Sequence, residues 1–170
     1  MRSPILRFWT EAGNGAIAAP MQLDVSRWRG LLLMVLIISL VATEIELLLL
    51  EHLESLTQWI PVVLIALGLL AALGVALRPG KWMLTIFRAL MALFLAAGTL
   101  GLYLHYRGNV EFELEMNPAL NGFELFRKTM MGATPVLSPG VMCQLGLLGL
   151  LYTFRHPRLQ NADALPETRP

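Results

Sequence analysis

Four long apolar segments constrain the fold of this chain more than any other feature of its sequence. They cover residues 30–50, 59–77, 82–106 and 138–154. A helix of roughly 20 apolar residues crosses the hydrocarbon core of a bilayer, which is about 30 Å thick. Residues 59–77 contain no charged side chain, whereas a helix of a soluble bundle carries polar residues along one face. The sequence therefore predicts an all-α integral membrane protein with four transmembrane helices.

The composition agrees with this class and excludes several others. Hydrophobic residues make up 56% of the 170 residues and charged residues only 15%. An ordinary globular domain has roughly 45–50% apolar residues, even with glycine counted among them. Disordered chains and nucleic-acid-binding proteins need a higher charge density, so nucleic acid is not expected as a partner. The single cysteine, Cys143, excludes an internal disulfide and a cysteine-based zinc site. The lipid bilayer is the first partner that the sequence implies.

The positions of the basic residues predict the orientation. Lys and Arg gather in the cytoplasmic loops, close to the ends of transmembrane helices. If both termini are cytoplasmic, nine basic residues lie inside and only three, Arg107, Arg127 and Lys128, lie outside. The sequence therefore predicts a multi-pass protein of the cytoplasmic (plasma or inner) membrane with both termini inside.

Three regions accompany the predicted spans of the transmembrane domain, residues 30–154. Residues 1–29 combine large apolar side chains with arginine, which favours a segment lying on the inner leaflet; a flexible tail is the alternative. Residues 107–133 form an outer loop. Residues 155–170 contain three prolines and are predicted to be a disordered cytoplasmic tail.

The outer loop has two patterned segments. Apolar and mostly acidic residues alternate over 109–116, which predicts a strand with one apolar and one acidic face. A lone strand cannot satisfy its own backbone hydrogen bonds, so it would need a partner strand from another subunit or a second copy. An extended loop along the membrane surface is the alternative. Residues 122–131 have apolar side chains at helical spacing and predict a short amphipathic helix that ends at Gly132.

Small residues recur at intervals of four within the spans, and membrane helices pack closely through such residues. The second span has Gly68, Ala72 and Ala76, and the third has Ala92 with Ala96 and Ala97 with Gly101. The fourth span has Gly146 and Gly149. The sequence therefore predicts a tightly packed four-helix bundle in which the second and third spans lie closest together.

Glu44 and Glu46 are the sharpest candidate site residues, because they lie within the first predicted span. A carboxylate in hydrocarbon costs several kcal/mol unless it is paired, hydrated or protonated. The two side chains point about 160° apart on a helix, so they do not form one carboxylate pair. They would serve as a proton or cation site, or as a contact to another subunit. The alternative places both at the outer interface, with Leu47–Leu50 continuing the helix above the membrane.

Arg88 is the one basic residue inside a predicted span, about two turns from the cytoplasmic end of the third. Its long side chain can extend to the interface, which is the simplest interpretation. An ion pair with Glu44 is not expected, since Glu44 lies nearer the other leaflet. The partners that the sequence allows are Gln144 of the fourth span, a backbone carbonyl or a lipid phosphate.

The outer ends of the spans and the outer loop also gather carboxylates and histidines. The carboxylates form a predicted outer acidic face, which consists of Glu51, Glu54, Glu111, Glu113 and Glu115. His52 and His105 lie near them, and imidazoles among carboxylates bind zinc, copper or iron. The chain has no pair of histidines at helical spacing, which argues against a metal site. We identify no cofactor from the sequence.

Three classes of function follow from these features. The chain has no nucleophile elbow, zinc-protease or P-loop motif, which favours a non-catalytic role. The predicted unpartnered strand favours a subunit or scaffold of a larger membrane complex, bound to other membrane subunits or to a second copy. The alternative is a small oligomeric transporter or channel that uses Glu44 or Glu46. The third is a membrane metal or redox protein built on His52, His105 and the outer carboxylates.

Overall fold

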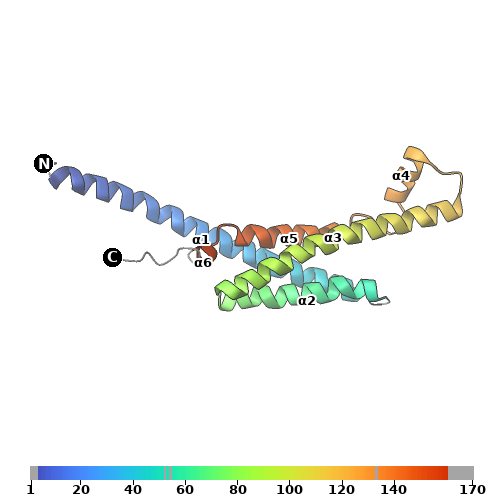
Figure 1. Ribbon diagram of the computed structural model, residues 1–170, viewed down its shortest axis with the longest axis horizontal. Helices are drawn as coiled ribbons and strands as arrows, with labels where there is room; N and C mark the ends of the chain where they lie inside the picture. The colour runs from blue at the N-terminus through green and yellow to red at the C-terminus, as the bar shows by residue number, and fades with distance from the viewer. Residues whose placement is uncertain (1–3, 52, 54, 133, 161–170) are drawn as a thin grey trace, which may run out of the picture.

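Helices account for all the regular secondary structure in the described part of the chain (Figure 1). The computed structural model describes the backbone of residues 4–51, 53, 55–132 and 134–160, and the side chains within these ranges from Val25 onward. The helices are α1 (Pro4–Leu49), α2 (Leu56–Leu77), α3 (Lys81–Met116), α4 (Gly122–Met130), α5 (Gly140–Thr153) and α6 (Pro157–Gln160). Three of them are long and apolar enough to cross a membrane: α1 over Val25–Leu49, α2 and α3.

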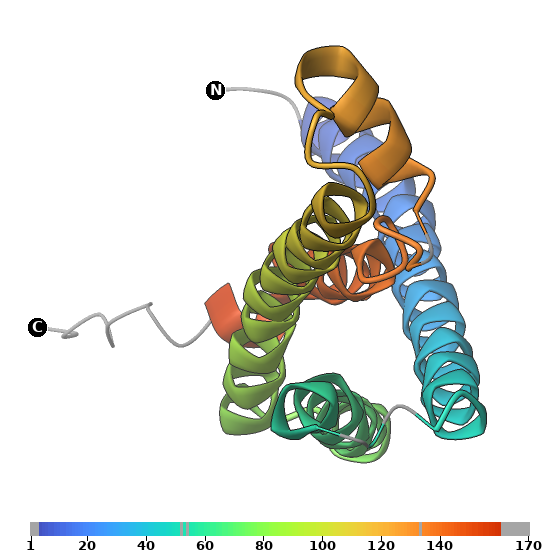
Figure 2. The ribbon, with the colours of Figure 1, turned by 90° about the vertical axis from the view of Figure 1, so that its right-hand side faces the viewer.

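Four of these helices pack in a ring, in the order α1, α2, α3, α5 and back to α1. Figure 2, which looks along the bundle, shows α2 between the ends of α1 and α3, and α5 between α1 and α3 on the other side. The large side chains that remain exposed on α1, α2 and α3 are mostly Leu, Ile and Val. Such a surface requires an apolar solvent, as the bilayer provides.

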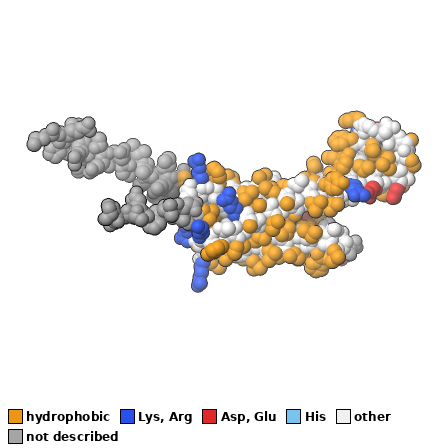
Figure 3. Space-filling view, in the orientation of Figure 1, with side chains coloured by type: hydrophobic (Ala, Val, Ile, Leu, Met, Phe, Trp, Pro, Cys, Tyr) orange, Lys and Arg blue, Asp and Glu red, His pale blue; other side chains and the backbone are white. Residues whose placement is uncertain are grey.

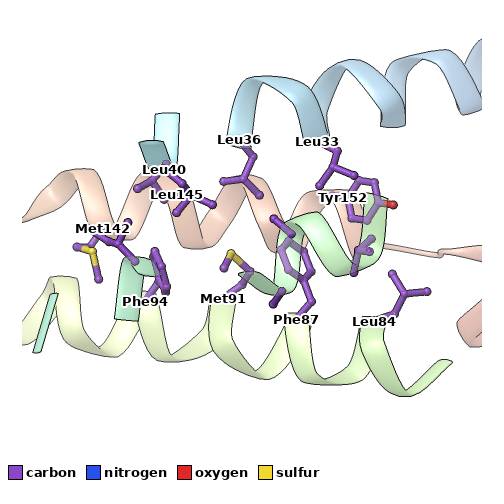
Figure 4. Close-up of a cluster of buried hydrophobic side chains, with 14 residues drawn as sticks. Leu33, Leu36, Leu40, Leu84, Phe87, Met91, Phe94, Met142, Leu145 and Tyr152 are labelled. Carbon is purple, nitrogen blue, oxygen red and sulfur yellow. The ribbon is translucent and has the colours of Figure 1, made fainter. Parts of the chain in front are cut away.

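The core of the ring draws buried side chains from all four helices, and α5 lies between α1 and α3. Leu36 and Leu40 of α1 point toward it from one side and Met91 and Phe94 of α3 from the other, all four fully buried (Figure 4). The helical spacing of these residues places them on one face of each helix. Phe87 of α3 adds an edge-to-face contact with Tyr152 of α5, with ring centroids 5.9 Å apart, and so anchors the far end of α5.

The closest helix contact lies between α3 and α5, so the prediction that the second and third spans lie closest is wrong. A methyl group on Gly146 would lie 2.7 Å from the carbonyl oxygen of Met91, and one on Gly98 would lie 2.8 Å from the backbone nitrogen of Cys143. Glycines on both helices therefore let the backbones approach closely. Ala92 and Ala96, which were expected to pack, are exposed instead.

The predicted strand over 109–116 is also wrong, because these residues continue α3 as a helix to Met116. A helix satisfies its backbone hydrogen bonds within the segment and needs no partner strand. Glu, Leu and Met are good helix formers, and Glu111 forms a favourable ion pair with Arg107 one turn earlier. The outer loop therefore shortens to residues 117–139, which include the predicted amphipathic helix as α4 (Gly122–Met130).

The ends of the spans differ from the expected boundaries in three places. The backbone of α1 is helical from Pro4 onward. From residue 4, the predicted interfacial segment over 1–29 is therefore continuous with the first span. Helix α5 has 14 residues and is about 21 Å long, shorter than a bilayer core. The predicted disordered tail begins with the helical turn of α6, and residues 161–170 lie outside the described residues.

Replacing Gly146 by alanine tests the α3–α5 contact. We expect G146A to lose about 1–3 kcal/mol of stability, because its methyl group would overlap a backbone carbonyl that cannot move aside. The measurement is unfolding of the purified protein in mild detergent. The matched control is G30A, since nothing lies within 4 Å of the position of its methyl group in α1. Equal stability of the two variants would contradict this account of the packing.

Candidate functional site

Most described charges lie at the two ends of the bundle (Figure 3), and the end with the carboxylates also carries Arg107, Arg127 and Lys128. One end carries Lys and Arg from the start of the α1 span, the α2–α3 turn and the residues after α5: Arg27, Arg29, Arg78, Lys81, Arg155 and Arg158. The other end carries most of the described carboxylates, on α3, α4 and the α1–α2 turn. We call these the basic end and the acidic end. At the basic end, α6 also contacts α3 and the α2–α3 turn.

Glu44 lies on the buried face of α1, one turn after Leu40. Its side chain is half-buried, and its Oε2 atom is fully enclosed without a hydrogen-bond partner among the described residues. Glu46 is exposed on a different face of the helix, as the spacing predicts. Because α1 ends at Leu49, Glu44 lies about 7.5 Å from the acidic end of the helix. Only Glu44 of the two therefore faces the interior of the bundle.

Arg88 is exposed on α3 and has neither a hydrogen bond nor an ion pair among the described residues. Gln144, one of its expected partners, lies between the contacts of Cys143 with Gly98 and of Gly146 with Leu95. That level is about 10–15 Å along α3 from Arg88, so Gln144 is not its partner. Arg88 instead lines a pocket of about 460 Å³ with Thr153, Arg155 and other residues from the end of α5 through α6.

Two arginines hold the segment after α5 in place at the basic end. The guanidinium of Arg29 donates hydrogen bonds to the carbonyl oxygens of Phe154 and Arg155, at 3.1 Å and 3.0 Å. Positive charge at the carboxyl end of a helix is favourable, because the last carbonyl groups have no partners within the helix. Arg158 donates to the carbonyl oxygen of Pro79 and so ties α6 to the α2–α3 turn. The basic end is therefore a fixed structure.

The environment of His156 shows that the electrostatic field at the basic end is positive. Its ring packs against that of Tyr152, with centroids 5.7 Å apart. Burial lowers the pKa of His156, and the positive charges of Arg29 and Arg158 lower it further. The imidazole is therefore neutral near pH 7, and the surrounding field favours anions.

At the acidic end, Asn109 attaches the chain after α4 to α3. Its side chain is only 3% exposed and donates to the carbonyl oxygens of Thr129, at 3.0 Å, and Thr134, at 2.7 Å. Its own oxygen accepts a hydrogen bond from the backbone nitrogen of Thr134 at 3.2 Å. The imidazole of His105 adds a contact to the carbonyl oxygen of Pro135 at 3.1 Å. The end of α3 and the segment 122–135 thus form a fixed helical hairpin, the α3–α4 hairpin.

The described carboxylates of the predicted outer face do not gather into one cluster. Glu111 pairs with Arg107 one turn earlier, at 2.8 Å, and both side chains are largely exposed. Glu113 faces α4 and lines a shallow pocket with Arg127 and Lys128, whereas Glu115 is exposed. Glu51 lies in the α1–α2 turn. His52, a weak candidate metal ligand, and Glu54, of the predicted acidic face, lie outside the described residues.

The candidate metal ligands do not lie in a cluster within the described part of the chain. No group of three or more His, Cys, Asp or Glu residues there is arranged to hold a metal ion. His105 faces a backbone carbonyl instead of a carboxylate. The described geometry therefore adds no support to the hypothesis of a metal or redox protein.

The tip of the α3–α4 hairpin exposes large apolar side chains. Met116, the last residue of α3, is 73% exposed, and Phe123, at the start of α4, is 77% exposed. Met131, after α4, is 75% exposed. The ring of Phe126 lies between Phe123 and Tyr106, with centroids 6.3 Å and 6.4 Å away, so the aromatic side chains form a row along the hairpin.

Asn109 is the site residue that sequence reasoning missed. The alternating pattern placed it at the start of a strand, with no expected role. The signal that could have found it is an uncharged amide in helical phase with the residues of the third span. A buried amide needs hydrogen-bond partners, and the short loop after α4 supplies them.

Comparison of the chain with protein-family models, with curated proteins and with solved structures finds no match. The class of the protein therefore rests on its own helices. Three of them have the length and composition of membrane spans, and no strand occurs in the described ranges. Over the described residues the protein is all-helical, with three helices suited to crossing a membrane.

Replacing Asn109 by alanine tests how the hairpin is held. We expect N109A to lower the free energy of local opening by about 2 kcal/mol, because two carbonyl groups and one amide would lose a buried partner. Hydrogen exchange over residues 122–137 should then be roughly thirtyfold faster. The control is N121A, since Asn121 is exposed and donates one local hydrogen bond. Unchanged exchange in N109A would refute this role.

Proposed function

We propose that the protein is a non-catalytic integral membrane subunit, or scaffold, of a larger membrane complex. In this proposal it presents the α3–α4 hairpin to another membrane subunit. The observation that carries the proposal is the exposed apolar tip of a hairpin that projects from the bundle (Figure 1). Three arguments support it.

The first argument is length. Helix α3 has 36 residues and is about 54 Å long, whereas the hydrocarbon core of a bilayer is about 30 Å thick. With Trp82 at one interface, the other end of α3 therefore extends beyond the hydrocarbon. The charged residues of this end, among them Arg107 and Glu111, agree with a position outside the membrane core.

The second argument is the surface of the hairpin. Exposed aromatic and Met side chains outside the hydrocarbon core mark protein or membrane contacts. Phe, Tyr, Met and Arg are also the residue types enriched where proteins bind one another. Met116 and Phe123 lie at the tip of the hairpin, farthest from the bundle, where a neighbouring subunit has access to them.

The third argument is rigidity. A surface that is already ordered before binding loses less conformational entropy when it binds. The two arms of the hairpin are already held together before any partner binds. Hydrogen bonds between Asn109 and Thr134 and the ring contact of Tyr106 with Phe126 join α3 to α4 and the chain after it. The hairpin is therefore built like a docking element and not like a loop that folds on binding.

We further propose the orientation and the number of spans. The basic end faces the cytoplasm, following the positive-inside rule, and both termini lie on that side of the cytoplasmic membrane. Helix α5 then completes a fourth crossing together with the turns over 134–139. The carbonyl of Pro135 lies against His105 near the acidic end, which supports a path across most of the bilayer.

The test is co-purification from native membranes in mild detergent, with chemical cross-linking and mass spectrometry. We expect M116S/F123S to weaken partner binding by about 2 kcal/mol, or roughly thirtyfold, since both side chains are exposed contact residues. The control is L56S, because Leu56 is 89% exposed at the same end of the bundle but on α2. A wild-type protein that purifies alone, or a partner that both variants retain, would rule the proposal out.

A second function has one observation in its favour. The enclosed Oε2 atom of Glu44 faces the bundle interior without a described hydrogen-bond partner. A carboxylate within a membrane span binds a proton or a cation, or finds a polar contact. In an oligomer, such a residue would serve as the ion-coupling group of a small transporter or channel.

Proton flux in liposomes tests this second function. We expect E44Q to abolish flux that a potassium diffusion potential drives, because a neutral amide neither binds nor releases a proton. E46Q is the matched control, since Glu46 is exposed two residues away and should leave flux unchanged. Equal flux in wild type and E44Q would exclude Glu44 as a coupling residue.

A further inference from the structure

We propose that the pocket at the basic end binds the phosphate of an anionic phospholipid, with the acyl chains lying along the outer side of the α3–α5 contact. This site requires only that the protein lies in a membrane. It does not depend on a partner subunit or on ion transport.

The lining of the pocket suits a phosphate group. Its polar side chains are those of Arg88, Thr153, Arg155, His156 and Gln160. They offer two guanidinium groups, which bind phosphate oxygens through paired hydrogen bonds, together with the side-chain amide of Gln160. The hydroxyl of Thr153 donates its proton to the carbonyl oxygen of Leu150 and is not available to the phosphate. The volume of about 460 Å³ lies within the range of small-ligand pockets.

The charge around the pocket has the right sign. No Asp or Glu among the described side chains lines it. Arg29 and Arg158 add positive charge from the neighbouring turns, and both lie near enough to influence His156. Their own hydrogen bonds go to backbone carbonyls, which leaves their charge uncompensated by any described carboxylate. Basic pockets of this kind between membrane helices bind anionic lipid headgroups.

The position of Arg88 favours a lipid over a soluble anion. It lies seven residues, or about 10 Å, from the start of α3 at Lys81. Trp82, beside Lys81, is highly exposed and marks the interface. A cation at this depth is costly unless it reaches an anion of the headgroup layer. Arg88 has no described protein partner that would fill this role.

A path for the acyl chains leads away from the pocket. Ala92 and Ala96 follow Arg88 at intervals of one helical turn, and both are exposed. On α5, the exposed Leu147 lies one turn before Leu150, which lines the pocket. We propose that these small and apolar side chains receive the acyl chains.

Native mass spectrometry of the full-length protein in mild detergent tests the site, with dioleoylphosphatidylglycerol as the anionic probe and dioleoylphosphatidylcholine as the zwitterionic one. We expect selective retention of phosphatidylglycerol, and roughly tenfold or greater weakening in R88Q, which loses a charged hydrogen-bond donor. The matched control is R78Q, because Arg78 is exposed at the same end but does not line the pocket. Circular dichroism of both variants verifies that they are folded.

Two further arms separate a lipid from a soluble phosphate. A92L should weaken phosphatidylglycerol binding, because its side chain fills the proposed acyl path and leaves every charge in place. Millimolar glycerol phosphate should not displace the bound lipid, since it lacks acyl chains. Displacement by glycerol phosphate, or full binding by A92L, would overturn the lipid assignment. Equal loss in R88Q and R78Q, or no loss in R88Q, would overturn the pocket itself.

Discussion

The close packing of α3 against α5 is the contact on which the rest of the structure depends. Gly98 and Gly146 bring the two backbones together where any side chain would meet a carbonyl or amide. Helices in lipid gain little from burying apolar surface, so this close approach is what holds a helix of only 14 residues in the bundle. Its position in turn brings the carbonyl groups after α5 to Arg29 and lets α6 contact the α2–α3 turn.

This arrangement of helices determines where the charged residues of the protein lie. In the sequence they nearly cancel, at a formal net charge of +1. In the structure most of the described basic residues lie at one end, around a pocket, whereas most of the described acidic residues lie on and around a projecting hairpin, together with Arg107, Arg127 and Lys128 (Figure 3). A protein with so few charges places most of them where helices end. The two proposed binding surfaces therefore lie at opposite ends of one bundle.

The sequence predicted the helical class and the apolar segments, because length and hydrophobicity alone determine which segments can cross a bilayer. It failed at 109–116, since a short alternating run fits a strand and a helix alike, and the continuation of α3 decides between them. It also failed to identify the closest helix pair, because Gly146 and Ala92 look equally small in a sequence. Only the structure tells which small residue meets a backbone. Asn109 was missed for a similar reason, as its partners are backbone atoms that lie 20 and 25 residues away along the chain.

The uninterrupted course of α3 has a mechanical consequence. Arg88 and Asn109 lie on one helix without proline, about 30 Å apart, so α3 acts as a lever between the pocket and the hairpin. A tilt of about 5° at the pocket displaces the hairpin by about 3 Å over that length. A lipid that favours one tilt therefore favours it for any protein bound at the other end, and the influence runs equally in both directions. The lipid composition of one leaflet and the binding of a partner at the opposite face would then both depend on the tilt of α3.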